Sequence, residues 1–334
     1  MRRLVVAVLT ALLLGVLVAP ESEAGVRIVD LGTLGGSVSE AHDVNDQGTV
    51  VGESQLPDGS THAFLWRDGH MRDLGTLGGG ESVAYAVNDR DQVVGSSRRA
   101  DGRIHAFLWR DGHMKDLGAF GHTTSAGVDI NDLGQVLMRF DQNIAPIIWQ
   151  EGADPIQVRV AGAALVLATG LNHRDQVVGR VDLAQPPPGT AGEQGFAWHN
   201  GHTTLLGTLG GFSSIALGLN DRGEIVGQSL PAGSDRPHAF LWREGTMTDL
   251  GTLNGTESWA QGINLHTTVV GSIWRPDLSR TRAFRWRNGH MRDLGVLDPA
   301  SNADTRANAI NDQDQVVGTS GAAVGMHAVL WRPV

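Results

Sequence analysis

Short hydrophobic segments separated by polar turns fill most of the chain, and they return in a fixed order of four. One copy reads "SVAYAVN" at 82–88, "QVVG" at 92–95, "HAFLWR" at 105–110 and "HMKDLG" at 113–118. Segments this short, rich in β-branched and aromatic residues and bounded by Gly, Asn and Asp, predict strands. A "DG" or "NG" pair between the third and fourth segments predicts a tight hairpin, and "ND" after the first predicts a turn. We therefore expect an all-β protein.

Two marker residues fix the number of copies. An Asn ends the first segment and a Trp lies in the third, and each recurs seven times. The marker asparagines are Asn45, Asn88, Asn131, Asn172, Asn220, Asn264 and Asn311. The marker tryptophans are Trp66, Trp109, Trp149, Trp198, Trp242, Trp286 and Trp331. Spacings of 40 to 49 residues are typical of propeller blades with four strands each.

The two ends of the chain complete each other. The last copy stops at Val334, after its third segment, whereas residues 26–32 read as a fourth segment without the first three. Pairing the two predicts a single domain over residues 25–334, a seven-bladed β-propeller of four-stranded blades, with the N-terminal strand completing the last blade and closing the ring. The alternative is an open solenoid, which needs distinct capping repeats. The chain shows no such caps.

The beginning of the chain predicts export. Arg2 and Arg3 precede an apolar run from Leu4 to Ala19, and "SEA" places small residues before Gly25. This is the pattern of a signal peptide over residues 1–24, and the alternative is an uncleaved anchor. No later stretch is long enough to span a membrane, and no cysteine is present. The net charge is −10 without a basic stripe, which argues against nucleic acid as a partner.

The motifs "HAFLW", "DLGTLGG" and "VNDxGQVVG" recur in order across residues 26–334. In these motifs the chain resembles the extracellular HAF repeat family, named for its His-Ala-Phe triplet. The resemblance implies a secreted or surface-exposed bacterial repeat protein. It carries over no catalytic residues, because the family offers no established reaction. Copies three and four depart from the pattern, with "APIIW" and "QGFAW" in place of "HAFLW".

Motifs for chemistry are missing from the pattern. We find no nucleophile elbow, no zinc motif and no phosphate loop, and we predict no catalytic residue, no metal site and no cofactor. Equivalent histidines on different blades lie too far apart to share a zinc ion. Two function classes stay open. The chain is either a binding or scaffolding propeller for a protein or glycan, or an extracellular lyase or glycoside hydrolase with its site at the channel mouth.

Recognition is expected on the face where the connections between second and third segments vary. Trp259 and Trp274 lie there outside the repeat pattern, and Arg275 follows directly. We expect the two Trp nearly opposite each other on neighbouring strands, close enough for contact, as a ligand-binding group that stacks on a sugar or anchors a partner. The alternative is that both fill a gap beneath a loop of copy six.

Overall fold

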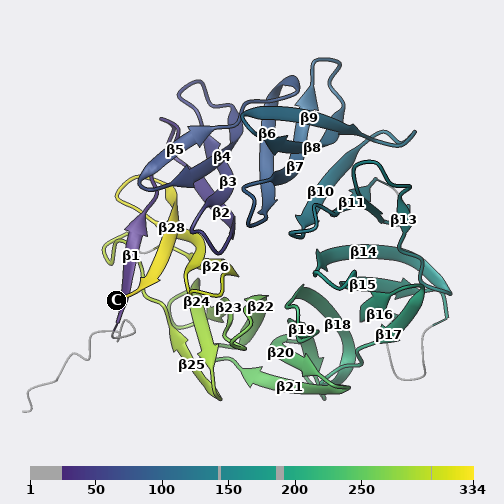
Figure 1. Cartoon of the computed structure of the whole chain (residues 1–334). Coiled ribbons are helices and arrows are strands. Elements are labelled where there is room, and N and C mark those ends of the chain that lie inside the picture. Colours follow the sequence, from purple (N-terminus) through teal and green to yellow (C-terminus); the bar gives the residue numbers. More distant parts are fainter. Residues whose placement is uncertain (1–24, 142–143, 186–191, 302) are drawn as a thin grey trace, which may run out of the picture.

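The computed structural model describes residues 25–141, 144–185, 192–301 and 303–334 and contains sheets arranged as a ring (Figure 1). The sheets follow one another around a central axis in chain order, which confirms the predicted all-β propeller. The predicted signal peptide, residues 1–24, lies outside the described residues. Within the described ranges, no helix is long and apolar enough to cross a membrane.

Copies three to six each form a separate four-stranded antiparallel sheet. Copy three has β10 (Ser125–Ile130), β11 (Val136–Phe140), β12 (Ile147–Trp149) and β13 (Ile156–Gln157). Copy four has β14 (Ala163–Leu171), β15 (Val177–Leu183), β16 (Glu193–His199) and β17 (His202–Leu205). Copy five has β18 (Gly210–Leu219), β19 (Ile225–Pro231), β20 (His238–Arg243) and β21 (Thr246–Gly251). Copy six has β22 (Glu257–Ile263), β23 (Val269–Arg275), β24 (Arg280–Arg287) and β25 (His290–Asp293).

The two chain ends build a fifth four-stranded sheet. It consists of β26 (Thr305–Ile310), β27 (Val316–Gly321), β28 (Met326–Pro333) and β1 (Val26–Asp30). Strand β1 pairs with β28 from Val26 opposite Pro333 to Asp30 opposite Val329. The carboxylate of Asp30 also forms a hydrogen bond with Nδ1 of His327, at 3.0 Å. The equivalent bond in copy one joins Asp73 to Nδ1 of His62 at 2.9 Å. The predicted pairing of the two ends is confirmed (Figure 1).

Copies one and two share one eight-stranded sheet. Its strands are β2 (Ser39–Val44), β3 (Val50–Gln55), β4 (Thr61–Arg67), β5 (His70–Asp73), β6 (Gly78–Val87), β7 (Val93–Arg99), β8 (Ile104–Arg110) and β9 (His113–Gly118). The prediction of seven separate four-stranded blades is therefore wrong, because five four-stranded sheets stand alone. The physical reason is a parallel bridge between Thr61 of β4 and Glu81 of β6, which joins the sheets of copies one and two.

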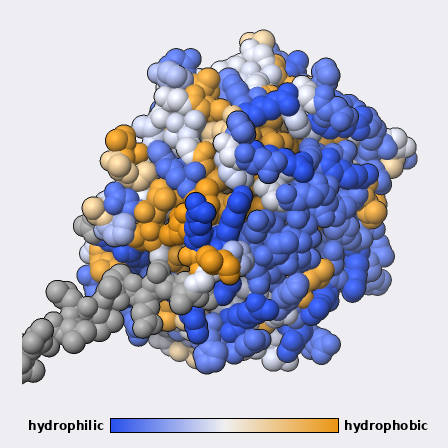
Figure 2. Space-filling model, turned by 60° about the vertical axis from the view of Figure 1, so that its left-hand side comes forward, coloured by the Kyte–Doolittle hydropathy of each residue, from blue (hydrophilic) through white to orange (hydrophobic). Residues whose placement is uncertain are grey.

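The core lies between neighbouring sheets. The Phe of the third strand is fully buried in five copies, at Phe64, Phe107, Phe196, Phe240 and Phe284. The "VVG" glycine allows the two inner strands to approach, since a Cβ on Gly95 would lie 1.9 Å from the carbonyl oxygen of Val83. The outer surface on the β1 side is largely hydrophilic, with hydrophobic side chains gathered mainly in one half of the view (Figure 2).

Candidate binding site in the central channel

Every innermost strand contains a β-bulge at the same place. The ladder to the second strand skips the residue three positions before the marker Asn. A bulge re-aims the side chain of its extra residue. These bulge residues line a central channel of about 340 Å³, and they are His42, Tyr85, Val128, Thr169, Leu217, Gln261 and Asn308. We call them the bulge ring.

The bulge ring carries a different residue in every copy, although the residue directly before it is always Ala or Gly and the marker Asn three positions later is constant. In chain order around the axis, Gln261, Asn308, His42 and Tyr85 form one arc with polar or aromatic side chains. The other arc is formed by Val128, Thr169 and Leu217, which are apolar or small. The channel therefore offers hydrogen-bonding groups on one side and an apolar surface on the other. This combination suits a small ligand with both characters.

Two rings of the polar arc lie together. The imidazole of His42 and the phenol of Tyr85 are tilted at 48° with centroids 5.9 Å apart. The Tyr85 hydroxyl accepts a hydrogen bond from Oγ of Ser96 at 3.4 Å. Nε2 of His42 is buried and has no hydrogen-bond partner among the described residues. Burial lowers the pKa of His42, against the opposing effect of Glu40, so its ring is neutral near pH 7.

The other two residues of the polar arc, Asn308 and Gln261, both have amide side chains, but only that of Asn308 is held by hydrogen bonds. Nδ2 of Asn308 donates to Oε1 of Glu40 at 3.0 Å and to the carbonyl oxygen of Ala41 at 2.9 Å. The Gln261 side chain, in contrast, makes no hydrogen bond to any residue that the structure describes. An amide with its donors and acceptor open to the channel can take new partners. Gln261 is therefore a ready hydrogen-bonding group for a ligand.

The seven marker asparagines form a closed ring of hydrogen bonds in the channel wall. Nδ2 of each donates to the main-chain carbonyl oxygen of the next marker Asn, at 2.8 to 3.1 Å. The last of these bonds joins Asn311 to Asn45 and so links the last copy to the first. Each Asn is also buried. This asparagine ring fixes the neighbouring copies to one another at the axis.

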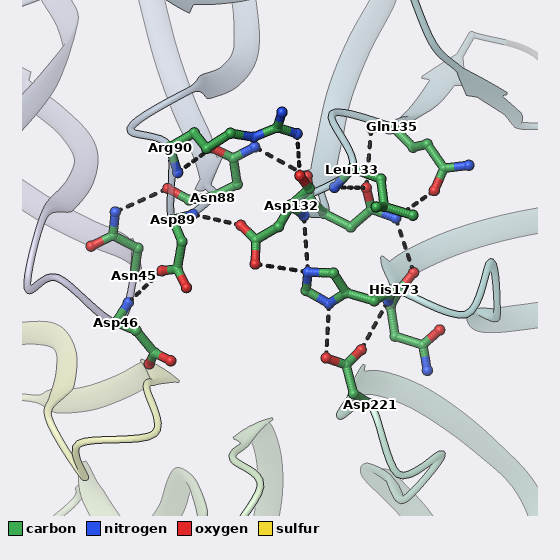
Figure 3. Close-up of polar contacts among 12 residues, drawn as sticks. Asn45, Asp46, Asn88, Asp89, Arg90, Asp132, Leu133, Gln135, His173 and Asp221 are labelled. Carbon is green, nitrogen blue, oxygen red and sulfur yellow. Dashed lines mark hydrogen bonds and ion pairs between the residues drawn. The ribbon is translucent and has the colours of Figure 1, made fainter.

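The residues after the marker asparagines form a rim at this end of the channel, partly shown in Figure 3. They are Asp46, Asp89, Asp132, His173, Asp221, Leu265 and Asp312. A carboxylate oxygen of one member accepts the main-chain N–H of the previous one, as between Asp89 and Asp46 at 2.9 Å. Burial raises the pKa of Asp46 and of Asp89, and neighbouring carboxylates add to the effect. We call this set the acidic rim.

His173 lies between two carboxylates on one side of the acidic rim. Its Nε2 lies 2.7 Å from Oδ2 of Asp132 and its Nδ1 lies 2.8 Å from Oδ2 of Asp221 (Figure 3). Burial lowers the pKa of His173, but the two carboxylates outweigh it and the net shift is upward. The far side of the rim has carboxylates without a His partner, which favours neutral polar groups or cations over anions at this mouth.

Two further carboxyl groups are buried in the inner strands. Asp43 accepts the main-chain N–H of Val87 at 2.9 Å, and Asp129 accepts that of Leu171 at 2.7 Å, each from the next copy. Burial raises the pKa of Asp43 to about 6 and that of Asp129 to about 7. Both groups hold adjacent copies together and titrate near neutral pH. Among the described residues, no group of His, Asp and Glu side chains has the geometry to hold a metal ion.

The structure places the sequence-predicted residues on copy six, away from the acidic rim. Trp259 pairs with Ser272, and Trp274 pairs with Glu257, so the two Trp lie on one face of the sheet but two positions apart. They are diagonal neighbours rather than opposite ones, and no ring contact between them occurs in the described part of the chain. Both are partly buried. The Arg275 guanidinium is held by Asp277 at 2.8 Å.

The sequence reasoning missed the bulge ring, because it placed recognition on the face where the connections between second and third segments vary. The signal was available as variation: a position with seven different residues lies between a constant small residue and a constant Asn. A bulge itself leaves no mark in the sequence, because it is a property of the pairing between strands. The acidic rim was visible as "ND", yet these letters are equally explained by a turn.

Comparison with known proteins shows the fold and leaves the family unassigned. No family model matches the chain, and no curated protein matches it. The chain is similar to virginiamycin B lyase from Staphylococcus aureus, with a TM-score of 0.58 and 9% identity over 92% of this chain and 100% of that one. It is also similar to the acylaminoacyl peptidase of Pyrococcus horikoshii, with a TM-score of 0.54 and 10% identity over 88% and 51%.

The WD40 β-propeller domain of Doa1 is similar at a TM-score of 0.48 and 14% identity, over 91% of this chain and 96% of that one. Identities this low show a shared fold and transfer no reaction. The resemblance to the HAF repeat family stays a prediction from the motifs. The ring of sheets, together with the two similarities whose TM-scores exceed 0.5, supports a β-propeller fold, and the sequence shows that it is built from repeats.

Proposed function

We propose that this protein is a secreted or surface-exposed binding or scaffolding propeller that recognises a protein or a glycan. The observation that carries the proposal is the bulge ring, in which a constant backbone presents seven different side chains to one channel. A pocket of about 340 Å³ has room for one sugar ring or one side chain of a partner.

The chemistry of the channel limits the kinds of ligand that it can bind. The acidic rim disfavours an anion at the mouth, whereas the polar arc provides the open amide of Gln261 and the two rings of His42 and Tyr85. A neutral sugar matches this set, since its hydroxyls bond to amides and its apolar face packs on rings. A basic side chain of a protein partner matches the rim equally well.

The test is a glycan and protein array probed with the full chain, followed by affinity measurement on the strongest ligand. Gln261→Ala and Tyr85→Ala should each weaken binding by at least tenfold, whereas Asp68→Ala on an outer hairpin should leave it unchanged. Equal affinity in all variants would rule out the channel as the site. Incubating the ligand with the protein and assaying for products separates binding from the alternative, a lyase or glycoside hydrolase.

Trp259, Trp274 and Arg275 are our proposed second contact, on the face with the variable loops. Trp259 lies two residues before Gln261 on β22. The proposed second contact is therefore on the same strand as a residue that lines the channel. Replacing both Trp with Ala should reduce affinity while the free energy of unfolding falls by less than about 1 kcal/mol. A larger loss of stability would mean that the pair fills a gap, and unchanged affinity would remove it from the site.

A further inference from the structure

The outer hairpin of copy four, β16–β17, has smaller side chains on one face than its counterpart in copy one. Residues 194–205 read "QGFAWHNGHTTL", and residues 62–73 read "HAFLWRDGHMRD". Ala197 pairs with Thr204 across the two strands and lies two residues from His199, so the three side chains share a face. Each is smaller than the residue of copy one at its position, and those residues are Leu65, Arg72 and Arg67.

A larger residue occupies the position of Ala197 in every other copy, and these residues are Leu65, Leu108, Ile148, Leu241, Arg285 and Leu330. Ala197 packs in the cluster between copies four and five, beside Val178 and Trp242. An Ala in place of a core Leu leaves a cavity unless the surroundings close over it. A cavity of about 290 Å³ lies here, and its lining includes Val178, Ala197, Thr204, Ile225 and Trp242. We call it the copy-four cavity.

At three other junctions between copies, a cation of one copy covers the marker Trp of the next. Measured from the charged group to the ring centroid, the pairs are Arg72 and Trp109 at 5.2 Å, Lys115 and Trp149 at 5.6 Å, and Arg332 and Trp66 at 5.6 Å. A cation within about 6 Å of an indole centroid is attracted by the ring. Arg72 and Lys115 hold the same position of the repeat, opposite the Leu of the third strand.

The junction of copies four and five has the marker Trp without such a cation. Thr204 occupies the position that provides the cation in copies one and two, and His199 occupies that of Arg332. No Lys or Arg side chain lies over the ring of Trp242 within the described part of the chain. Trp242 is partly exposed, whereas Trp66 is buried. The cavity is therefore bordered by an indole that lacks the partner its counterparts have.

Copy five separates the two changes. Thr248 occupies the position of Thr204, but Leu241 keeps the large side chain and packs in the cluster that contains Trp286. Copy four alone combines a small residue at the Leu position with a small residue opposite it. The missing volume and the missing cation therefore coincide in this copy.

We propose that the copy-four cavity binds an arginine side chain of a protein partner. The aliphatic part of that side chain occupies the volume that Leu fills in other copies, and its guanidinium lies against the indole of Trp242. A planar guanidinium stacks well on aromatic rings, and Arg provides two of the three cations at the other junctions. The net charge of −10 attracts a basic partner.

The copy-four cavity is distinct from the channel. The two share one lining residue, Leu219, and the cavity otherwise lies where the sheets of copies four and five face each other. The proposal therefore does not depend on the function proposed for the channel. It is tested with variants that leave the bulge ring and the acidic rim intact.

The test is a titration of the full chain with the capped tripeptide acetyl-Gly-Arg-Gly-amide, followed by the NMR signals of the indole N–H groups. A second peptide has citrulline in place of Arg, which keeps the shape and removes the charge, and it should bind at least tenfold more weakly. Ala197→Leu fills the cavity, and Thr204→Arg supplies the protein's own cation; each should weaken binding of the Arg peptide at least tenfold. The matched control is Thr248→Arg, which adds the same charge at the equivalent position of copy five and should change affinity less than twofold.

Three results would overturn the proposal. The first is absence of binding of the Arg peptide, and the second is equal affinity for the Arg and citrulline peptides, which would show that the charge is not recognised. The third is binding that Ala197→Leu and Thr204→Arg both leave unchanged, which would place the peptide elsewhere, such as at the acidic rim. Both variants introduce residues that copy one has at these positions, and melting temperatures at or above that of the intact chain show that they are folded. If one variant unfolds, the other decides.

Discussion

Two positions of the innermost strand, three residues apart, are treated in opposite ways by the seven copies. The marker Asn is the same in all, and the bulge residue is different in each. The Asn side chain is itself part of the fold, because its amide closes the turn and reaches the next copy. The bulge itself is made by backbone pairing and requires no particular side chain, so the residue there can vary. The comparison separates positions that hold the ring together from positions that can recognise a ligand.

Removing residues 25–32 should have the largest effect, because it opens the ring on which both positions depend. The loss exposes the edge of β28 and the packing surface of Val26 and Ile28. We expect roughly 4–8 kcal/mol of lost stability from the apolar area, or aggregation through the free edge. The loss is measured by comparing the free energies of unfolding of residues 33–334 and residues 25–334 in denaturant titrations.

The control for this truncation is Asp30→Asn. It weakens only surface contacts, those with His327 and with the main-chain N–H of Gly32, so it should cost less than about 1 kcal/mol. If the truncated chain unfolds at the same denaturant concentration as the intact chain, β1 does not close the ring in solution, and the asparagine ring must be sufficient alone.

Asn264→Ala should have the next largest effect on stability. It tests the role of the constant marker Asn. Its Oδ1 accepts the N–H of His266 and of Thr268, and its Nδ2 donates to the carbonyl of Asn311. Truncation leaves these buried groups without partners, which should reduce the free energy of unfolding by about 2–4 kcal/mol. A loss below about 1 kcal/mol would mean that the asparagine ring contributes little, and the contrast between the two positions would fail.

The pH dependence of stability should be smaller and should fall as pH rises. The raised pKa of Asp129, about 7, means that the folded state holds a proton between about pH 4 and 7 that the unfolded state has lost. Stability therefore decreases as pH rises through this range. Asp43, with its pKa raised to about 6, acts in the same direction. So does His173, whose pKa is raised, since the stabilisation of its cation is lost as pH rises through the folded pKa.

His42 opposes this trend, because its lowered pKa costs stability as pH falls. The net expectation is a loss of the order of 1–3 kcal/mol between pH 5 and pH 8, measured by thermal or denaturant unfolding. Asp129→Ala introduces the residue that copy two has at the equivalent position, Ala86. This variant should show a weaker dependence of unfolding free energy on pH. An unchanged profile in this variant would show that Asp129 is ionised in the folded state throughout this pH range.

The sequence was sufficient for the parts of the fold that repeat. Recurring Asn and Trp gave the copies, and the unfinished last copy gave the pairing of β1 with β28. The shared sheet of copies one and two was not predictable, because it depends on a single bridge between Thr61 and Glu81. The channel site was hidden for a related reason. Pairing details decide which side chain faces the axis, and only the variation at the bulge position marked it.

Gln261→Ala should have the smallest effect on stability and sharpens the comparison most. Gln261 and Asn264 are amides on the same strand, but Gln261 makes no side-chain hydrogen bond to the described residues. Truncation therefore leaves no buried group unsatisfied, and we expect a change of less than about 0.5 kcal/mol in unfolding free energy. Affinity for the ligand found by array screening should fall at least tenfold in the same variant. A stability loss as large as that of Asn264→Ala would place Gln261 with the structural ring and leave the variable position without a separate role.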